Sequence, residues 1–351
     1  MSRVPASVRS LVRIVTMCSL AAVLLASCAS TTPAIKPHVT GLPAVSISVP
    51  LSTVACTTDN SCVAIGTSNL DVSPTSVGEY QSATGRWTTL TVPVADTSTY
   101  IQSSSCWNRG CLFVGSQSGG DLVWNYDATT HSISVAHGPS GAIGIDAISC
   151  YATLTCAVFD STKGDKRFLT TSDGGVTWSS PVTITIPASD SVTSLSCVSQ
   201  LTCVASFESS SNGIAVYVTN DGGQTWTPRS DTSTISWAAL TSLDCAGRTC
   251  VGLAKLSFGW RVERSDNLGK TWKKVAPVRG PIVTMACTTL DRCVVGGTKN
   301  FQTSTPYLAT VVSKVVTPVA LKYVPSPISD VACGSTICAA IGVTTVMTLQ
   351  P

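Results

Sequence analysis

Cysteine is the reactive residue that stands out in this sequence, with 16 copies against three histidines. Thiols at short spacings can hold zinc, carry out redox chemistry or join as disulfides. Zinc sites prefer two to four intervening residues and further cysteine or histidine ligands, and the only histidines are His38, His131 and His137. We therefore predict disulfides, no metal site and no cofactor. Fourteen cysteines form seven pairs with four or five residues between the members: Cys56 and Cys62, Cys106 and Cys111, Cys150 and Cys156, Cys197 and Cys203, Cys245 and Cys250, Cys287 and Cys293, and Cys333 and Cys338.

The cysteine pairs mark an internal repeat. The first member recurs after 50, 44, 47, 48, 42 and 46 residues, and a period in this range is typical of propellers and other repeat arrays. A strand-like run precedes the first cysteine, as in residues 193–197, and the second cysteine opens another apolar run, as in residues 62–66. This pattern predicts a β-hairpin with opposed cysteines about 4.5–5.5 Å apart at Cα. Seven such units predict an all-β fold, a seven-bladed β-propeller with four-stranded antiparallel blades.

The first 27 residues have the features of a secretory signal. They combine a basic start, with three arginines and no acid, with an apolar run over residues 11–25 that ends in small residues. The run is short for a membrane span, which needs about 20 apolar residues. We predict that residues 1–27 are a cleaved signal. The protein would then be exported, to a compartment where disulfides persist.

The end of this signal carries a second feature. Leu25-Ala26-Ser27-Cys28 resembles the lipobox of bacterial lipoproteins, and this resemblance implies cleavage before Cys28 and a diacylglyceryl group on its sulfur. The alternative is an ordinary signal cut near Ala29 or Ser30. Two or more acyl chains would anchor the protein stably to a bilayer. We therefore expect an extracytoplasmic lipoprotein, on the inner or the outer membrane.

The chain beyond residue 27 carries no net charge. The whole sequence has 22 Lys and Arg against 19 Asp and Glu, and removing the three arginines of the signal leaves 19 of each. This balance excludes an electrostatic case for nucleic-acid binding. We assign residues 28–40, which include serine, threonine and two prolines, to a flexible tether and residues 41–351 to the propeller, which we expect to be a monomer.

Three repeats share a turn motif in their second halves. Residues 171–178 and 219–226 fit Ser/Thr-x-Asp-x-Gly-x-Thr-Trp, residues 265–272 fit it with Asn in place of Asp, and residues 82–87 keep a worn version. The motif resembles the Asp-box of BNR (bacterial neuraminidase repeat) propellers, which include sialidases and photosystem II assembly factors. Asp or Asn would accept bonds from its turn, Gly would take a positive φ, and Trp would pack the turn on the neighbouring sheet. The motif residues are Asp173, Gly175, Trp178, Asp221, Gly223, Trp226, Asn267, Gly269 and Trp272.

The last repeat has room for three strands only, since its second cysteine lies 13 residues before the end. Residues 44–49 alternate like a strand and precede the first repeat. We predict that this segment adds the outer strand to the seventh blade and closes the ring.

The sequence gives little support for catalysis. The sialidase resemblance would require three arginines, a Tyr–Glu pair and an acidic residue, often after a Phe-Arg-Ile-Pro-like motif, and that motif is absent. The chain has only three glutamates, of which Glu263 alternates with Arg261 as a structural ion pair would. We assign no catalytic residue and favour a non-enzymatic binding or assembly platform for an unknown protein or glycan partner. The alternative is a sialidase-like glycoside hydrolase or a lectin.

One charged segment stands out among the polar loops that should gather on one face. It lies in the third repeat, where a ligand site competes with an ordinary solvated loop. Phe207, Trp260 and Phe301 lie near equivalent loops, either as stacking surface or as core. The candidate ligand residues are Asp160, Lys163, Asp165, Lys166 and Arg167.

Overall fold

The computed structural model describes residues 51–66, 77–90, 100–117, 120–139, 144–162, 165–185, 191–209, 213–229, 237–321 and 324–351. All of them belong to one compact unit, Ile35–Pro351. The predicted signal, lipidation site, tether and strand at 44–49 lie outside the described residues, as does Lys163. Within the described part of the chain, no helix is long and apolar enough to span a membrane.

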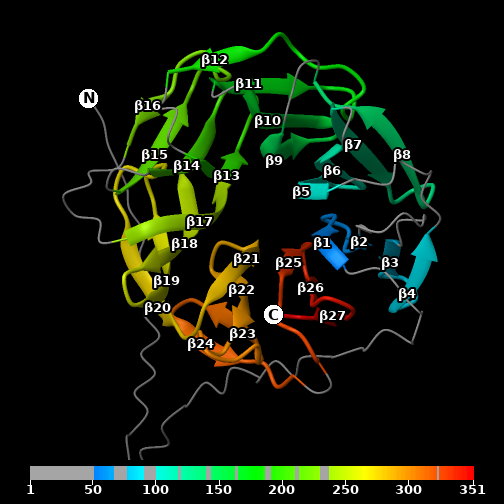
Figure 1. Cartoon of the computed structure of the whole chain (residues 1–351), viewed down its shortest axis with the longest axis vertical. Helices are drawn as coiled ribbons and strands as arrows, with labels where there is room; N and C mark the ends of the chain where they lie inside the picture. The colour runs from blue at the N-terminus through cyan, green and yellow to red at the C-terminus, as the bar shows by residue number, and fades with distance from the viewer. Residues whose placement is uncertain are drawn as a thin grey trace, which may run out of the picture. The chain divides into compact units, whose positions relative to one another are not determined.

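The described residues form seven antiparallel sheets around one axis (Figure 1), which confirms the predicted seven-bladed β-propeller. Blades 1 to 3 contain β1 (Leu51–Cys56), β2 (Cys62–Gly66), β3 (Val77–Gln81) and β4 (Arg86–Leu90); β5 (Tyr100–Trp107), β6 (Gly110–Gln117), β7 (Gly120–Asp127) and β8 (Ser132–His137); and β9 (Ile145–Ala152), β10 (Thr155–Thr162), β11 (Asp165–Thr171) and β12 (Val182–Ile184).

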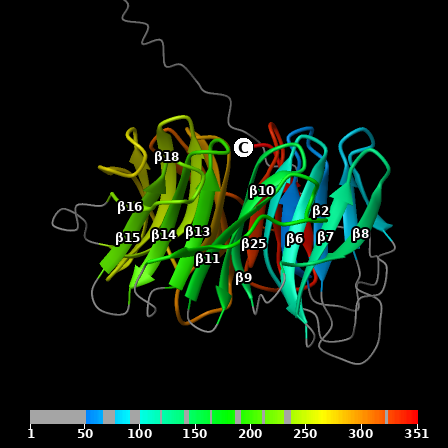
Figure 2. The ribbon, with the colours of Figure 1, turned by 90° about the horizontal axis from the view of Figure 1, so that it is seen from above.

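Blades 4 to 7 repeat this order of strands from the inside outward, and the seventh has three strands among the described residues. In Figure 2 their strands run between two faces of the ring. These blades contain β13 (Ser191–Cys197), β14 (Cys203–Ser209), β15 (Gly213–Thr219) and β16 (Thr227–Pro228); β17 (Trp237–Ala246), β18 (Thr249–Leu256), β19 (Gly259–Ser265) and β20 (Lys273–Val278); β21 (Ile282–Thr289), β22 (Arg292–Thr298), β23 (Pro306–Val312) and β24 (Val315–Pro318); and β25 (Asp330–Cys333), β26 (Cys338–Ile341) and β27 (Val346–Leu349).

All seven predicted disulfides are present, each joining the first and second strands of its blade. The paired Cα atoms are 3.9–4.1 Å apart, closer than the spacing expected from the sequence. In blade 1 the amide of Thr57 donates to the carbonyl of Ser61, so the adjacent Cys56 and Cys62 form a non-hydrogen-bonded pair. Strands approach most closely at such pairs.

The core consists of apolar layers between neighbouring blades. Phe159 and Phe168 of blade 3 pack against Trp226 of blade 4, with ring centroids 5.0 and 5.4 Å from that indole. The Asp-box turn places Trp226 there, and Gly223 at φ +90° lets the turn lie directly on Phe168. Ring packing of this kind adds to the free energy of burial. The predicted role of the Asp-box in packing a turn on the adjacent sheet is confirmed in this blade.

Blades 7 and 1 meet through both apolar and polar contacts. Ile337, Ala339 and Ile341 of blade 7 share a buried cluster with residues of blade 1. The Asp330 carboxylate accepts hydrogen bonds from the Val54 amide at 3.0 Å and the Thr53 hydroxyl at 2.8 Å. Its other oxygen accepts from Thr284 of blade 6 at 3.1 Å. Asp330 therefore links three consecutive blades across the junction between the last blade and the first.

Candidate functional site

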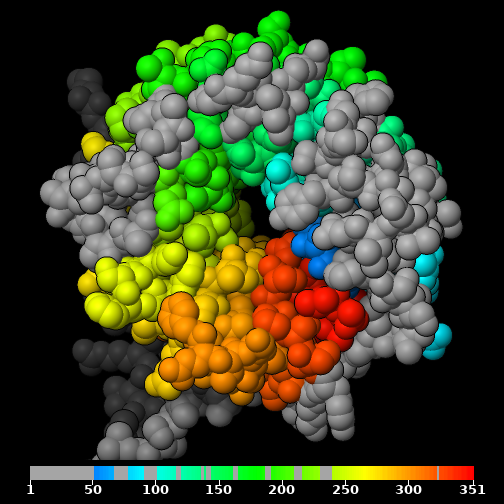
Figure 3. All heavy atoms as spheres, in the orientation of Figure 1, coloured from blue at the N-terminus to red at the C-terminus, as the bar shows by residue number. Residues whose placement is uncertain are grey.

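A channel of about 740 Å³ lies at the centre of the ring. Figure 3 shows the hollow, and its walls are the inner strands β1, β5, β9, β13, β17, β21 and β25. Serine and threonine dominate the lining, which also includes Asp146, Asp244 and Asp330; the described lining residues include no lysine or arginine. Hydroxyl groups both donate and accept hydrogen bonds. The channel therefore suits a polar ligand.

The first cysteine of every disulfide lines this channel. Between blades 2 and 5, a serine just before this cysteine accepts a hydrogen bond from the corresponding cysteine amide of the next blade. The amides of Cys150, Cys197 and Cys245 donate in this way to Ser105, Ser149 and Ser196, at 2.8–3.0 Å. Each of these bonds joins two blades at the channel wall. The lining is thus held by a disulfide within each blade and, over this arc, by serine bonds between blades.

Two of the channel carboxyls are electrostatically perturbed. Burial raises the pKa of Asp244 to about 6, against an opposing hydrogen bond from the Cys245 amide. Burial also raises the pKa of Asp330, although its hydrogen bonds from Val54 and Thr53 oppose the shift. Desolvation disfavours the charged form of a carboxyl group. The hydrogen bonds of Asp330 hold the blade junction together. Asp244 is therefore the wall carboxyl with a raised pKa that does not serve that junction.

The candidate ligand residues of blade 3 lie on strands. Asp160 on β10 pairs with Arg167 on β11 in register, is fully buried and accepts a hydrogen bond from Arg167 Nε at 3.0 Å. Lys166, also largely buried, lies 3.8 Å from Asp146, while Asp165 is exposed. These charges therefore form buried pairs, and of the four described residues only Asp165 is exposed to solvent.

The structure adds a carboxyl that the sequence did not single out. Asp121 on β7 is 5% exposed, and neither of its carboxylate oxygens has a hydrogen-bond partner among the residues that the structure describes. Burial and the nearby charge of Asp160 raise its pKa to about 6, with Asp146 acting in the same direction and Arg167 against it. Buried polar groups without partners are rare in proteins. Asp121, Asp146 and Asp160 thus form an acidic cluster between blades 2 and 3, which two cations only partly neutralise.

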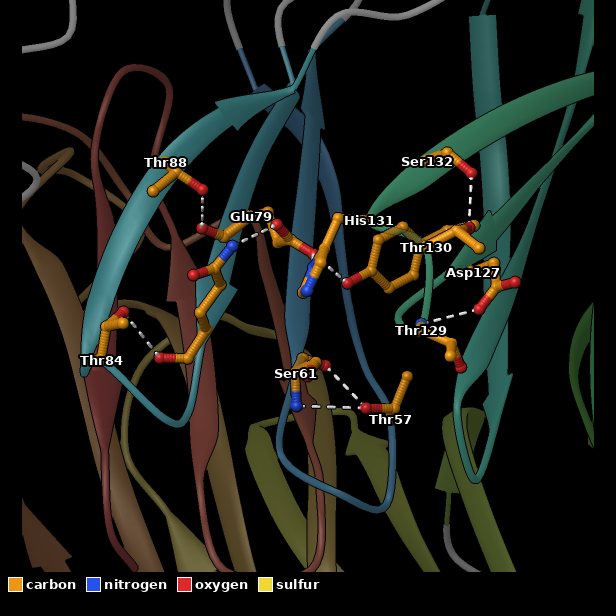
Figure 4. Close-up of polar contacts among 12 residues, drawn as sticks. Thr57, Ser61, Glu79, Thr84, Thr88, Asp127, Thr129, Thr130, His131 and Ser132 are labelled. Carbon is orange, nitrogen blue, oxygen red and sulfur yellow. Dashed lines mark hydrogen bonds and ion pairs between the residues drawn. The ribbon is translucent and has the colours of Figure 1, made fainter.

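A second polar group lies between blades 1 and 2 (Figure 4). Glu79 is fully buried and accepts hydrogen bonds from the Tyr126 hydroxyl and from Gln81, while His131 Nδ1 lies 2.7 Å from it. Burial and the bond to Glu79 raise the pKa of Tyr126. Asn125 occupies the equivalent position of blade 2, and its amide donates to the Gly174 carbonyl of blade 3. The two residues join successive blades, so we interpret the Glu79 group as structural.

The Asp-box side chains also stay within their turns. The Thr177, Thr225 and Thr271 amides donate to the Asp173, Asp221 and Asn267 side chains at 2.8–2.9 Å. These bonds hold each turn together from within, as a structural motif would. The bonds from Thr225 lower the pKa of Asp221 to about 2.

The remaining sequence candidates divide between core and surface. Glu263 is buried and paired with Arg261, as predicted. Phe207 and Trp260 are buried in the core, whereas Phe301 is 79% exposed. Within the described residues, no group of three or more His, Cys, Asp and Glu side chains could hold a metal ion.

Comparison with known proteins agrees with this architecture. The BNR/Asp-box repeat family matches residues 217–228, so the chain is an all-β propeller that carries a BNR/Asp-box repeat. A comparison with curated protein sequences gives no significant match.

The fold is shared with several solved structures. YCF48 bound to D1 peptide superposes with a TM-score of 0.62 at 14% identity, over 90% of this chain and 95% of that one. The WD40 repeats of RRP9 give 0.62 at 10% identity, over 89% and 97% of the two chains. A GH74 enzyme of Niastella koreensis gives 0.60 at 10% identity, over 86% of this chain and 52% of the enzyme. At these identities the likeness establishes the fold alone.

Proposed function

We propose that this chain is a lipid-anchored propeller that acts outside the cytoplasmic membrane as a non-enzymatic binding or assembly platform for a protein or glycan. The central channel carries the proposal, because its hydroxyl and carboxyl groups line a scaffold with a disulfide in every blade. A wall that is already rigid loses little conformational freedom when a ligand binds. YCF48, a structural neighbour, is itself bound to a peptide.

The buried glutamates support a non-enzymatic role. Glycoside hydrolysis requires two carboxyl groups that face one bond, one of them free to transfer a proton. Glu79 is engaged by Tyr126 and His131, and Glu263 by Arg261. The third glutamate of the chain, Glu208, is exposed at the end of β14. The positions of Glu79 and Glu263 suit blade packing better than chemistry on a substrate.

The disulfides and the first 28 residues support the proposed location. Seven disulfides are typical of an oxidising compartment, and the lipobox-like residues before Cys28 would supply the anchor. Incorporation of a clickable palmitate analogue into the wild-type chain, and its loss in Cys28→Ser, would support lipidation. Equal labelling of both proteins, or none in either, would contradict it.

Pull-down from an envelope extract tests the platform itself. Gln102 is exposed and lines the channel, so Gln102→Arg would introduce bulk and charge there, whereas Gln200→Arg changes an exposed hairpin residue that is not among the described lining residues. We expect the wild type and Gln200→Arg to retain one saturable partner and Gln102→Arg to lose it. The absence of a saturable partner, together with hydrolase turnover, would contradict the proposal.

A glycan-directed protein is the second candidate, favoured by the acidic cluster around Asp121 and by the shared fold of a GH74 enzyme. A fluorogenic glycoside panel and a glycan array separate the possibilities, since turnover indicates an enzyme and retention without turnover indicates a lectin. Turnover that Asp121→Asn removes would assign the cluster to catalysis.

A further inference from the structure

Two phenylalanines project from neighbouring blades on the same face of the ring. Phe258 is 97% exposed in the turn between β18 and β19, and Phe301 is 79% exposed in the connection between β22 and β23. Both connections join the second and third strands of their blades, so they lie on one face. Single exposed apolar residues are ordinary, but two large aromatic tips on adjacent blades form a surface. We call it the Phe258–Phe301 face.

Exposed cations surround these aromatic tips. Lys255 precedes the first turn, Lys299 belongs to the second connection, and Arg279 lies in the link between the two blades. None of the three is in an ion pair among the described residues. The face therefore presents three cations that form no ion pair with a described side chain.

The acids of blades 5 and 6 lie elsewhere. Asp266 and Asp291 pair with Arg264 near the turns of the opposite face, and Glu263 is buried. Asp244 lines the channel next to the disulfide of blade 5. The charges of these blades are thus separated between the two faces, with the cations beside the exposed phenylalanines.

An apolar groove of about 1050 Å³ opens beside two of these cations, Arg279 and Lys299. Its lining includes Tyr307, Leu308, Val319, Leu321 and Val324, and Arg279 and Lys299 belong to the same lining. An apolar hollow bordered by cations is complementary to an anionic amphiphile, with a hydrocarbon chain in the hollow and a phosphate beside the charges.

We propose that the Phe258–Phe301 face docks on an anionic phospholipid bilayer. Aromatic side chains insert at the headgroup level of a bilayer, and lysine and arginine are attracted to its negative surface. Phe258 projects from the short turn between β18 and β19, and Phe301 from the longer connection between β22 and β23. Two separate exposed side chains suit a deformable interface such as a bilayer better than a rigid partner surface without matching pockets. This contact does not depend on lipidation of Cys28 or on a ligand in the channel. It would set the orientation of the ring on the membrane.

Vesicle co-sedimentation tests the proposal without the lipid anchor. Residues 35–351 form one compact unit that contains all seven blades and their buried clusters, so this unit is the protein to use, with its disulfides formed. We expect sedimentation with vesicles of equal phosphatidylcholine and phosphatidylglycerol, little with phosphatidylcholine alone, and weaker binding in 0.5 M salt. Each neutralised cation should lower the affinity about fivefold. The triple variant Lys255→Gln, Arg279→Gln, Lys299→Gln should therefore bind about 100-fold more weakly.

The aromatic tips are tested by Phe258→Ser with Phe301→Ser, expected to weaken binding at least tenfold. Matched controls lie on the opposite face: Leu201→Ser with Val315→Ser for apolar exposure, and Arg248→Gln, Lys270→Gln, Lys314→Gln for charge. All these positions are exposed, so the fold should survive. Failure to bind phosphatidylglycerol vesicles, or equal losses in the control variants, would overturn the proposal. A partner protein captured through this face without vesicle binding would also overturn it, whereas failure of the channel pull-down would not.

Discussion

The buried carboxyl of Asp121 gives a quantitative prediction about stability and pH. Its pKa is about 6 in the folded protein and 3.8 in the unfolded reference, because burial and Asp160 disfavour the charged form. A raised pKa means that the folded chain holds this proton more tightly. The contribution of Asp121 to the free energy of unfolding is therefore complete below about pH 3.8 and is lost as the pH rises through about 6. The shift of about two units corresponds to about 3 kcal/mol at pH 7 and above.

Asp121→Asn removes this titration while keeping the shape of the side chain. We expect the variant to match the wild type near pH 4 and to become more stable by up to about 3 kcal/mol at pH 7–8. For a chain of this length that difference corresponds to about 5 °C in Tm. Urea unfolding of residues 35–351 at intervals from pH 4 to 8 measures it, with the exposed Asp165→Asn as control.

The pKa of Asp121 depends on the charged groups that face it. They are Asp146 from β9, Asp160 from β10 and Arg167 from β11. A difference between Asp121→Asn and wild type that stays constant across the pH range would refute a role for Asp121 ionisation. An Asn variant less stable than the wild type at pH 8 would show that the carboxylate has a favourable partner.

Three further predictions concern the scaffold. Asp330→Ala removes an acceptor from two backbone amides and two hydroxyls, of which the Val331 amide keeps the Thr284 hydroxyl and the Thr53 hydroxyl keeps Ser104. It should still cost at least about 1–3 kcal/mol in urea unfolding, because the Val54 amide loses its side-chain acceptor; a loss below about 1 kcal/mol would show that the junction of blades 7 and 1 does not depend on Asp330. Gly223→Ala would place a methyl group 2.1 Å from Phe168 and should be much more destabilising than Gly247→Ala, which has the same sign of φ but open space; equal Tm values would contradict this. Deletion of residues 41–50 should lower Tm sharply if they complete blade 7, and a truncated protein that melts with its parent would exclude that role.

The blade count and the disulfide pairing could be predicted from the sequence because both depend on local order. Cysteines five or six residues apart on a hairpin have one near partner each, and seven copies of one unit favour a closed ring. The Asp-box was equally predictable, since the bonds of Asp173 and Asp221 all stay within four residues of them. The expected strand at 44–49 remains a prediction.

The candidate site was less predictable, since its parts come from different blades. The hydrophilic residues of blade 3 suggested a solvated loop, but Asp160 and Arg167 oppose each other on adjacent strands and bury their charges. The sequence offered one signal of this pair, a polar residue within an otherwise apolar strand. That signal does not distinguish a buried ion pair from an ion pair on the surface. The exposure of Phe258 could not be predicted from the sequence either, because an aromatic residue beside a glycine is equally compatible with a buried position in the core.

The sequence alone determined the repeat, the disulfide pairing and the Asp-box turns, because each arises from residues close together in the chain. Only the tertiary structure decided that serines before the cysteines bond to the next blade, that Asp330 joins three blades, and that Asp121 has no hydrogen-bond partner in the described part of the chain. It also decided that the cations of blades 5 and 6 surround exposed phenylalanines, away from the acids. These features depend on distances between residues about one repeat or more apart, and local pattern does not fix such distances.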